Sequence, residues 1–142
     1  MEMALHEARL AGERGEVPIG AVLVKDGEVI AARGNERERR NDPTAHAEML
    51  VLRDAAAVLG GWRIPGATVY VTLEPCPMCA GALVLARIDR LVFGARDPKS
   101  GAAGTVMDLT ADPALNHRIG VTSGVGEKEA AEILQEFFGS RR

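Results

Sequence analysis

The sequence has few aromatic residues, only two cysteines, and no apolar run long enough to cross a membrane. A transmembrane helix needs about 20 consecutive apolar residues, so we exclude a membrane protein. Cys76 and Cys79 are too close in sequence to staple a fold, which excludes a disulfide-rich secreted domain. The acidic N-terminal segment is unlike the basic start of a secretory signal, and we therefore expect a cytoplasmic protein.

An excess of positive charge is also lacking. The 17 lysines and arginines face 20 aspartates and glutamates, which gives a net charge of −3. Any contact with nucleic acid must use a local basic patch, because no overall positive field attracts phosphates. The aromatic content of 4% argues against a broad stacking platform and favours a deep pocket for one splayed base.

The apolar pattern of the sequence predicts an α/β fold. The chain has 142 residues, of which 46% are hydrophobic, and no repeat or linker divides it, so we expect a single domain over residues 1–142. Periodicity predicts, in order, helix 1–14, strands 19–24 and 29–32, helix 45–59, strand 67–73, helix 77–86, strand 90–93 and helix 127–138. This order predicts a three-layer α/β/α domain with a mixed sheet, antiparallel at one edge and parallel beyond it.

The connecting segments carry further signals. Asp26-Gly27, between the first two strands, is typical of a tight hairpin turn. The polar residues 35–43 predict a loop, in which Asp42 or Thr44 can cap the helix that follows. Residues 96–104 are rich in glycine and predict a second irregular segment.

Two short motifs carry the chemistry, and each lies at the start of a predicted helix: His46-Ala47-Glu48 and Pro75-Cys76-Pro77-Met78-Cys79. The partial positive charge of a helix N-terminus lowers the pKa of a thiol, which favours the thiolate that binds metal. His46 can add one imidazole nitrogen. One nitrogen and two sulfur ligands leave a fourth tetrahedral position for water, which is the composition of a catalytic zinc site.

Glu48 follows His46 by two residues, about 200° around a helix, and is poorly placed as a fourth ligand on the same face. In the first turn, however, its carboxylate can reach past the helix end, accept a proton from water and pass it on. The motifs thus predict attack by water on an electron-poor carbon that bears an amine, with release of ammonia.

These motifs resemble those of the zinc-dependent cytidine and deoxycytidylate deaminase superfamily. Within that superfamily the chain is similar to the bacterial tRNA adenosine deaminases, in segments that extend over nearly its whole length: Glu16-Val17-Pro18-Ile19-Gly20, Asn35, Asp42-Pro43-Thr44, Phe93-Gly94-Ala95-Arg96-Asp97, Gly101-Ala102-Ala103-Gly104 and Asn116-His117-Arg118. The resemblance implies a cytidine deaminase-like fold with a five-stranded sheet. It also implies one zinc ion per subunit, held by His46, Cys76 and Cys79, with Glu48 as the proton carrier.

The resemblance further implies a substrate and a partner. The substrate is the wobble adenosine of a tRNA anticodon stem-loop, with an arginine tRNA as the implied one, and the product is inosine. Asn35 and the backbone of Ala47 would contact the purine, and Asp97 and Lys99 the flanking nucleotides. The protein would form a homodimer and need no organic cofactor.

The residues leave several alternatives open. A deaminase of free guanine or cytidine could use the same fold and the same zinc chemistry. A noncatalytic zinc-binding module would have no need of Glu48, and a thiol oxidoreductase would leave His46 unexplained. The apolar helix 77–88 fits a dimer contact and a core helix equally well.

The surface charges and the remaining histidines are also ambiguous. Arginines occur just before the zinc helix, in the second irregular segment and at the C-terminus, where each can contact phosphate or can belong to a solvated surface: Arg37, Arg39, Arg40, Arg96, Arg141 and Arg142. We expect His6 on the exposed side of its helix and His117 in a surface or loop role.

Overall fold

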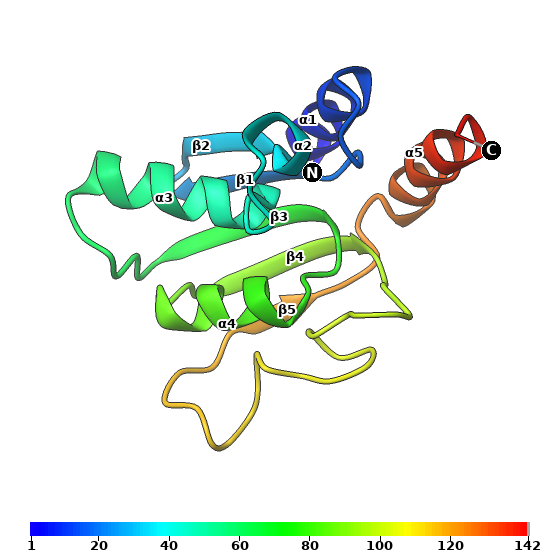
Figure 1. Cartoon of the computed structure of the whole chain (residues 1–142). Helices are drawn as coiled ribbons and strands as arrows, with labels where there is room; N and C mark the ends of the chain where they lie inside the picture. Colours follow the sequence, from blue (N-terminus) through cyan, green and yellow to red (C-terminus); the bar gives the residue numbers. More distant parts are fainter. Residues whose placement is uncertain (142) are drawn as a thin grey trace.

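The structure is a computed structural model, in which residues 1–141 are described. Five strands form a sheet in the order β2-β1-β3-β4-β5 (Figure 1). The strands are β1 (Gly20–Lys25), β2 (Glu28–Gly34), β3 (Ala67–Leu73), β4 (Arg90–Ala95) and β5 (Gly120–Thr122). β1 is antiparallel to β2 and to β3, whereas β3, β4 and β5 are parallel. The predicted mixed sheet is confirmed.

The hairpin of β1 and β2 follows from its turn residues. Asp26 and Gly27 have φ angles of 52° and 75°, so both lie in the left-handed region that a two-residue type I′ turn requires. Lys25 pairs with Glu28 on either side of this turn, and a bulge follows between Leu23 and Val24. The hairpin predicted from Asp26-Gly27 is confirmed.

The helices form a layer on each face of the sheet, as predicted. The helices α3 (Ala47–Leu59) and α4 (Pro77–Leu85) pack together over one face, and α1 (Glu2–Glu13) and α5 (Glu127–Gly139) over the other (Figure 1). The larger core cluster lies between the sheet and the helices α3 and α4. Its fully buried members include Leu23, Val51, Leu83 and Phe93. None of the helices within residues 1–141 combines the length and apolar character needed to cross a membrane.

Two short elements escaped the periodicity analysis. β5 has only three residues and pairs with β4 alone, and Val121 at its centre is 37% exposed, so no apolar alternation marks it. The segment 35–43 is not entirely a loop, because it contains the helix α2 (Arg37–Arg40). All four residues of α2 are charged and none is buried, so the helix shows no apolar stripe that a sequence pattern could detect.

The start of α3 also differs from the prediction. The helix begins at Ala47, and its N-cap is His46 rather than Asp42 or Thr44. The Asp42 carboxylate instead accepts hydrogen bonds from the Thr44 backbone N–H (2.8 Å) and hydroxyl (2.7 Å), in a turn that precedes the helix. His46 therefore occupies the N-cap position, and its side chain makes no capping hydrogen bond to the helix.

Candidate active site

Three potential metal donors meet where the starts of two helices converge. His46 is the N-cap of α3, Cys76 is the N-cap of α4, and Cys79 lies in the first turn of α4. The Nδ1 atom of His46 is 3.7 Å from Cys76 Sγ and 3.5 Å from Cys79 Sγ, and the three donors lie within 4.8 Å of one another. Zinc bonds of about 2.0 Å to nitrogen and about 2.3 Å to sulfur put such atoms about 3.5 Å apart at a tetrahedral angle. The donor set therefore fits zinc.

The pKa of each of these three donors depends on its neighbours. The hydrogen bond from Cys79 lowers the pKa of Cys76 to about 4, against the opposing effect of burial, with His46 adding to the lowering. The hydrogen bond to Cys76, together with burial, raises the pKa of Cys79. The hydrogen bond with Cys76 also raises the pKa of His46. A lowered pKa favours the thiolate form of Cys76 that binds metal, and a metal cation would displace the proton of Cys79 as well.

Glu48 is a buried carboxyl group beside the donors. It is the second residue of α3, its residue surface is only 4% exposed, and it lines the same pocket as His46 and Cys76. Burial raises its pKa, because removal from water disfavours the charged form. A raised pKa suits a group that takes up and returns a proton near neutral pH.

The pocket at the donors has a volume of about 100 Å³ and is lined by polar side chains of several segments, including Asn35, Arg37, Asp97 and Ser100. Asn35 is buried, and its Oδ1 accepts a hydrogen bond of 2.8 Å from the Ala47 backbone N–H. The two residues implied to hold a purine thus contact each other. The Ala47 N–H is engaged, which leaves the Asn35 side-chain amino group as the donor that faces the pocket.

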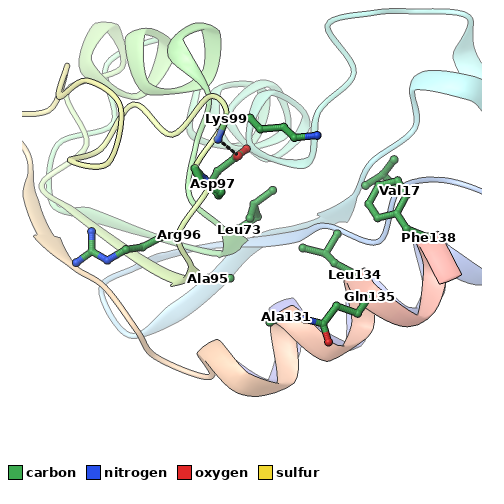
Figure 2. Close-up of a pocket in the computed structure, with 11 residues that line it drawn as sticks. Val17, Leu73, Ala95, Arg96, Asp97, Lys99, Ala131, Leu134, Gln135 and Phe138 are labelled. Carbon is green, nitrogen blue, oxygen red and sulfur yellow. Dashed lines mark hydrogen bonds between the residues drawn. The ribbon is translucent and has the colours of Figure 1, made fainter.

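A second, larger pocket adjoins the first. Its volume is about 410 Å³, and Leu73 and Asp97 line both pockets. Figure 2 shows Asp97 and Lys99 on one side of this second pocket and Leu134 and Phe138 of α5 on the other. Its wall is largely apolar, with the lysine at its edge.

Asp97 closes a turn within its own loop. Its Oδ1 accepts hydrogen bonds from the backbone N–H groups of Lys99 (2.9 Å) and Ser100 (3.3 Å), and its Oδ2 accepts one from the Ser100 hydroxyl (3.0 Å). A carboxylate has about four lone-pair positions, so one acceptor position remains beside the pockets.

Glu74 is a functional candidate that the sequence reasoning missed. It is 2% exposed, and its carboxylate accepts hydrogen bonds from the backbone N–H groups of Asp97 (3.1 Å), Ala103 (3.0 Å) and Thr105 (3.1 Å). A Cβ atom on Gly101 would lie 2.5 Å from this carboxyl group, so only glycine permits the approach. The one signal in the sequence was its place between a strand and Pro75-Cys76.

The basic residues of the sequence analysis divide into paired and unpaired groups. Arg39 and Arg40 pair with Glu36, at 3.8 and 2.5 Å, and so belong to a local ion-pair cluster. Arg37 lines the pocket at the donors, hereafter called the catalytic pocket. Arg96 donates to the Ser123 hydroxyl at 3.2 Å.

Arg141, His6 and His117 do not line the pocket at the donors. Arg141 stacks on Phe137, with 3.9 Å between its guanidinium carbon and the ring centroid, and Arg142 lies outside the described residues. His6 is exposed on α1, as expected. The Nε2 atom of His117 is 2.8 Å from the Ile88 carbonyl oxygen, a contact that ties the segment before β5 to the segment before β4.

The sequence and the fold of this chain match known proteins over most or all of their lengths. A family profile described as MafB19-like deaminase matches residues 1–142. A tRNA-specific adenosine deaminase of Bacillus subtilis (strain 168) is 55% identical over 142 residues, which are 100% of this chain and 88% of that protein.

Two solved structures also match. One, from studies of A-to-I editing by tRNA deaminases at the wobble position of transfer RNA, is 57% identical, with a TM-score of 0.92 over 94% of this chain and 97% of the other. The structure of a guanine deaminase from Bacillus subtilis is 33% identical, with a TM-score of 0.66 over 99% of this chain and 90% of that one.

The five-stranded sheet and a His-Cys-Cys donor set beside a buried glutamate define a deaminase. Within that class, the full-length identity is higher to a tRNA enzyme than to a free-base enzyme. The chain belongs to the family of the tRNA-specific adenosine deaminases.

Proposed function

We propose that this protein hydrolyses adenosine to inosine at the wobble position of a tRNA anticodon. The observation that carries the proposal is the buried carboxyl group of Glu48 beside the donors His46, Cys76 and Cys79. Glu48 lines a small pocket that shares lining residues with a larger one. We assign the target base and the reacting groups to the small pocket, and the neighbouring nucleotides of the RNA to the larger one. Since tRNA is used in translation, we expect the protein in the cytoplasm.

Each residue at the donor set has one task. His46, Cys76 and Cys79 would hold one zinc ion per subunit, and zinc, when bound, activates water for attack at neutral pH. Glu48 accepts a proton from the attacking water and delivers it to the amino group, which leaves as ammonia. Water and adenosine are consumed, inosine and ammonia are formed, and no organic cofactor takes part.

The target base would be held by Asn35 and by the start of α3. The Asn35 amino group donates to an acceptor on the purine, while the hydrogen bond from the Ala47 backbone to Asn35 Oδ1 fixes the orientation of that amide. A side chain locked in this way loses little further freedom when the substrate binds.

The flanking nucleotides would occupy the second pocket. Its apolar wall, which includes Leu134 and Phe138, suits the face of a base, and Lys99 at its edge suits a phosphate. The Asp97 acceptor position that the loop leaves free suits a sugar 2′-hydroxyl, the group that distinguishes RNA from DNA.

We also propose a homodimer that uses the outer surface of α3 and α4. Leu85 and Trp62 are 66% and 58% exposed there, beside a hollow of about 250 Å³ with an almost wholly apolar wall. A patch of this kind marks an interaction site, and a second copy of the chain is the occupant that the family resemblance implies. Sedimentation should give a dimer for the parent and a monomer for Leu85→Glu; a monomeric parent would refute the assignment.

The test of the proposed function is direct. Purified protein is incubated with an anticodon stem-loop that carries a wobble adenosine, and in parallel with free adenosine, cytidine and guanine. Inosine should form in the RNA far faster than any free compound reacts, because contacts to flanking nucleotides position the target base. An arginine anticodon loop should react fastest in a panel of loops. Efficient turnover of guanine or cytidine without RNA activity would establish the free-base alternative instead.

A further inference from the structure

Arg37 differs from the other two arginines of α2. Arg39 and Arg40 both lie against the Glu36 carboxylate, and their side chains are 64% and 45% exposed. The Arg37 Nε atom, by contrast, is buried and has no hydrogen-bond partner within residues 1–141. A buried donor without an acceptor is energetically unfavourable, and more so when the group is charged. The unpaired donor therefore indicates an acceptor that the protein does not itself supply.

The surroundings of Arg37 identify the kind of acceptor. Arg37 lines the catalytic pocket, and within the described part of the chain it is the one lysine or arginine among the lining residues. Three carboxyl groups, those of Glu48, Glu74 and Asp97, line the same pocket. A nucleotide that inserts its base here brings a phosphate toward these acidic groups, and the guanidinium is the group that can offset the repulsion.

Hydrogen bonds fix the backbone around Arg37. The buried Glu16 carboxylate accepts hydrogen bonds from the N–H groups of Glu38 (3.1 Å) and Arg39 (2.8 Å), so the N-terminus of α2 already holds an anion. The Arg37 carbonyl accepts the Asp42 N–H at 3.1 Å. The Arg37 side chain thus extends from a rigid support, and the N–H groups of Glu38 and Arg39 are not free to bind a phosphate.

We infer that Arg37 binds the phosphate of the nucleotide whose base enters the catalytic pocket, and thereby selects a nucleic acid over a free base or nucleoside. The inference rests on the proposed function and adds to it the group that recognises the target nucleotide's own backbone. A planar guanidinium can make two parallel hydrogen bonds to a phosphate. A nucleoside or a free base offers no such acceptor and leaves Arg37 unpaired.

The first experiment compares Arg37→Gln with Arg39→Gln, a matched control that removes the same charge from the same helix. Both variants are assayed on the stem-loop at several salt concentrations, after zinc content and thermal unfolding have been checked. Arg37→Gln should lower kcat/KM about ten- to hundredfold and reduce the slope of log affinity against log salt by about 0.7, as expected for one lost phosphate contact. Arg39→Gln should stay within about twofold of the parent, in line with the small effect of exposed ion pairs.

The second experiment locates the phosphate. Stem-loops carry a single uncharged methylphosphonate on the 5′ or the 3′ side of the target adenosine, or elsewhere in the loop. One of the two flanking substitutions should impair the parent and Arg39→Gln about equally, and should impair Arg37→Gln no further. If neither flanking substitution acts on the parent more than distant ones do, the inference is wrong, and this result does not depend on how any variant folds.

The outcomes separate the two proposals. Failure of the parent protein to deaminate any stem-loop would refute the proposed function. If the parent is active but Arg37→Gln and Arg39→Gln behave alike, only the assignment of Arg37 is refuted. Arg37→Lys provides a further check, because it should recover the salt dependence while recovering the rate only in part.

Discussion

Residues 35–46 and residues 97–105 both border the catalytic pocket, and a buried carboxylate holds each of them by its backbone. Glu16 accepts two backbone N–H groups of the first segment, and Glu74 accepts three of the second together with the Thr105 hydroxyl. The means of support is therefore the same on both segments.

The two segments differ in what they carry. The first contains α2 and ends at His46, where α3 begins, so it leads directly to a metal donor and to Glu48. The second contains neither helix nor strand, apart from one bridge between Ala103 and Asp108, and it contributes Asp97 and Lys99. In the proposed function, the reaction chemistry therefore depends on helix ends, and the contacts to neighbouring nucleotides depend on an irregular loop. We therefore expect that substitutions can disable the reaction chemistry and the nucleotide contacts separately.

The largest effect is expected from the metal donors. His46→Ala or Cys76→Ala should abolish both bound zinc and activity, because two remaining protein ligands hold zinc poorly. Metal analysis should find one zinc per chain in the parent and much less in the variants. Full zinc content in either variant would remove that residue from the ligand set.

Glu48→Ala should separate catalysis from metal binding. The substitution removes the proton carrier but no donor, so zinc content stays at one per chain while the rate falls about 100- to 10,000-fold. The measurement is single-turnover inosine formation with matched zinc loading. Retention of more than a few per cent of the rate would mean that another group moves the protons.

The anchoring carboxylates allow a direct comparison. In Glu74→Gln the amide nitrogen replaces one oxygen and cannot accept from its N–H donors, which should destabilise the fold by about 2–4 kcal/mol and raise KM for RNA more than it lowers kcat. Glu74→Gln loses two accepted hydrogen bonds in either orientation of its amide, those of two N–H groups or those of one N–H and the Thr105 hydroxyl. Glu16→Gln loses only one accepted hydrogen bond and should cost less, about 1–2 kcal/mol. Urea unfolding gives the stabilities, and zinc content should be unchanged in both. Equal losses of unfolding free energy in the two variants would contradict this count of lost hydrogen bonds.

The smallest effect is expected from Asp97→Asn. It should relax the preference for RNA over matched DNA stem-loops, because an amide nitrogen no longer accepts a 2′-hydroxyl, and it should leave zinc content unaltered. The same change also weakens the turn to Ser100, so Ser100→Ala is the control that alters the turn alone. If Asp97→Asn keeps the parent's RNA-to-DNA rate ratio, or if the control shifts it equally, Asp97 does not contact the sugar.

The sequence predicts the fold well wherever apolar residues repeat. β3 has the predicted bounds, and α3 and α4 differ from prediction by one or two residues, because buried stripes and flanking glycines mark these elements. The motifs also bring His46, Cys76 and Cys79 together as expected. α2 and β5 escape because neither buries an apolar face of its own.

The supports of the site could not be predicted in the same way. Glutamates are rarely fully buried, so Glu16 and Glu74 carry no local sign that they lie inside the protein. Their partners are backbone N–H groups more than 20 positions away, in the short helix α2 for Glu16 and in an irregular loop for Glu74. Only the tertiary fold brings such groups together, and the same holds for the unpaired Arg37.

The close approach of Gly101 to Glu74 has a consequence for protein engineering. A side chain at position 101 would meet both the Glu74 carboxyl group and the Asp97 carbonyl oxygen, 2.6 Å away. Residues 97–105 can therefore be replaced by the corresponding loop of a relative with a different substrate only if glutamate at position 74 and glycine at position 101 are both present. Evolution faces the same restriction, so substrate preference in this scaffold can drift at positions 97–100, while positions 74 and 101 change jointly or remain fixed.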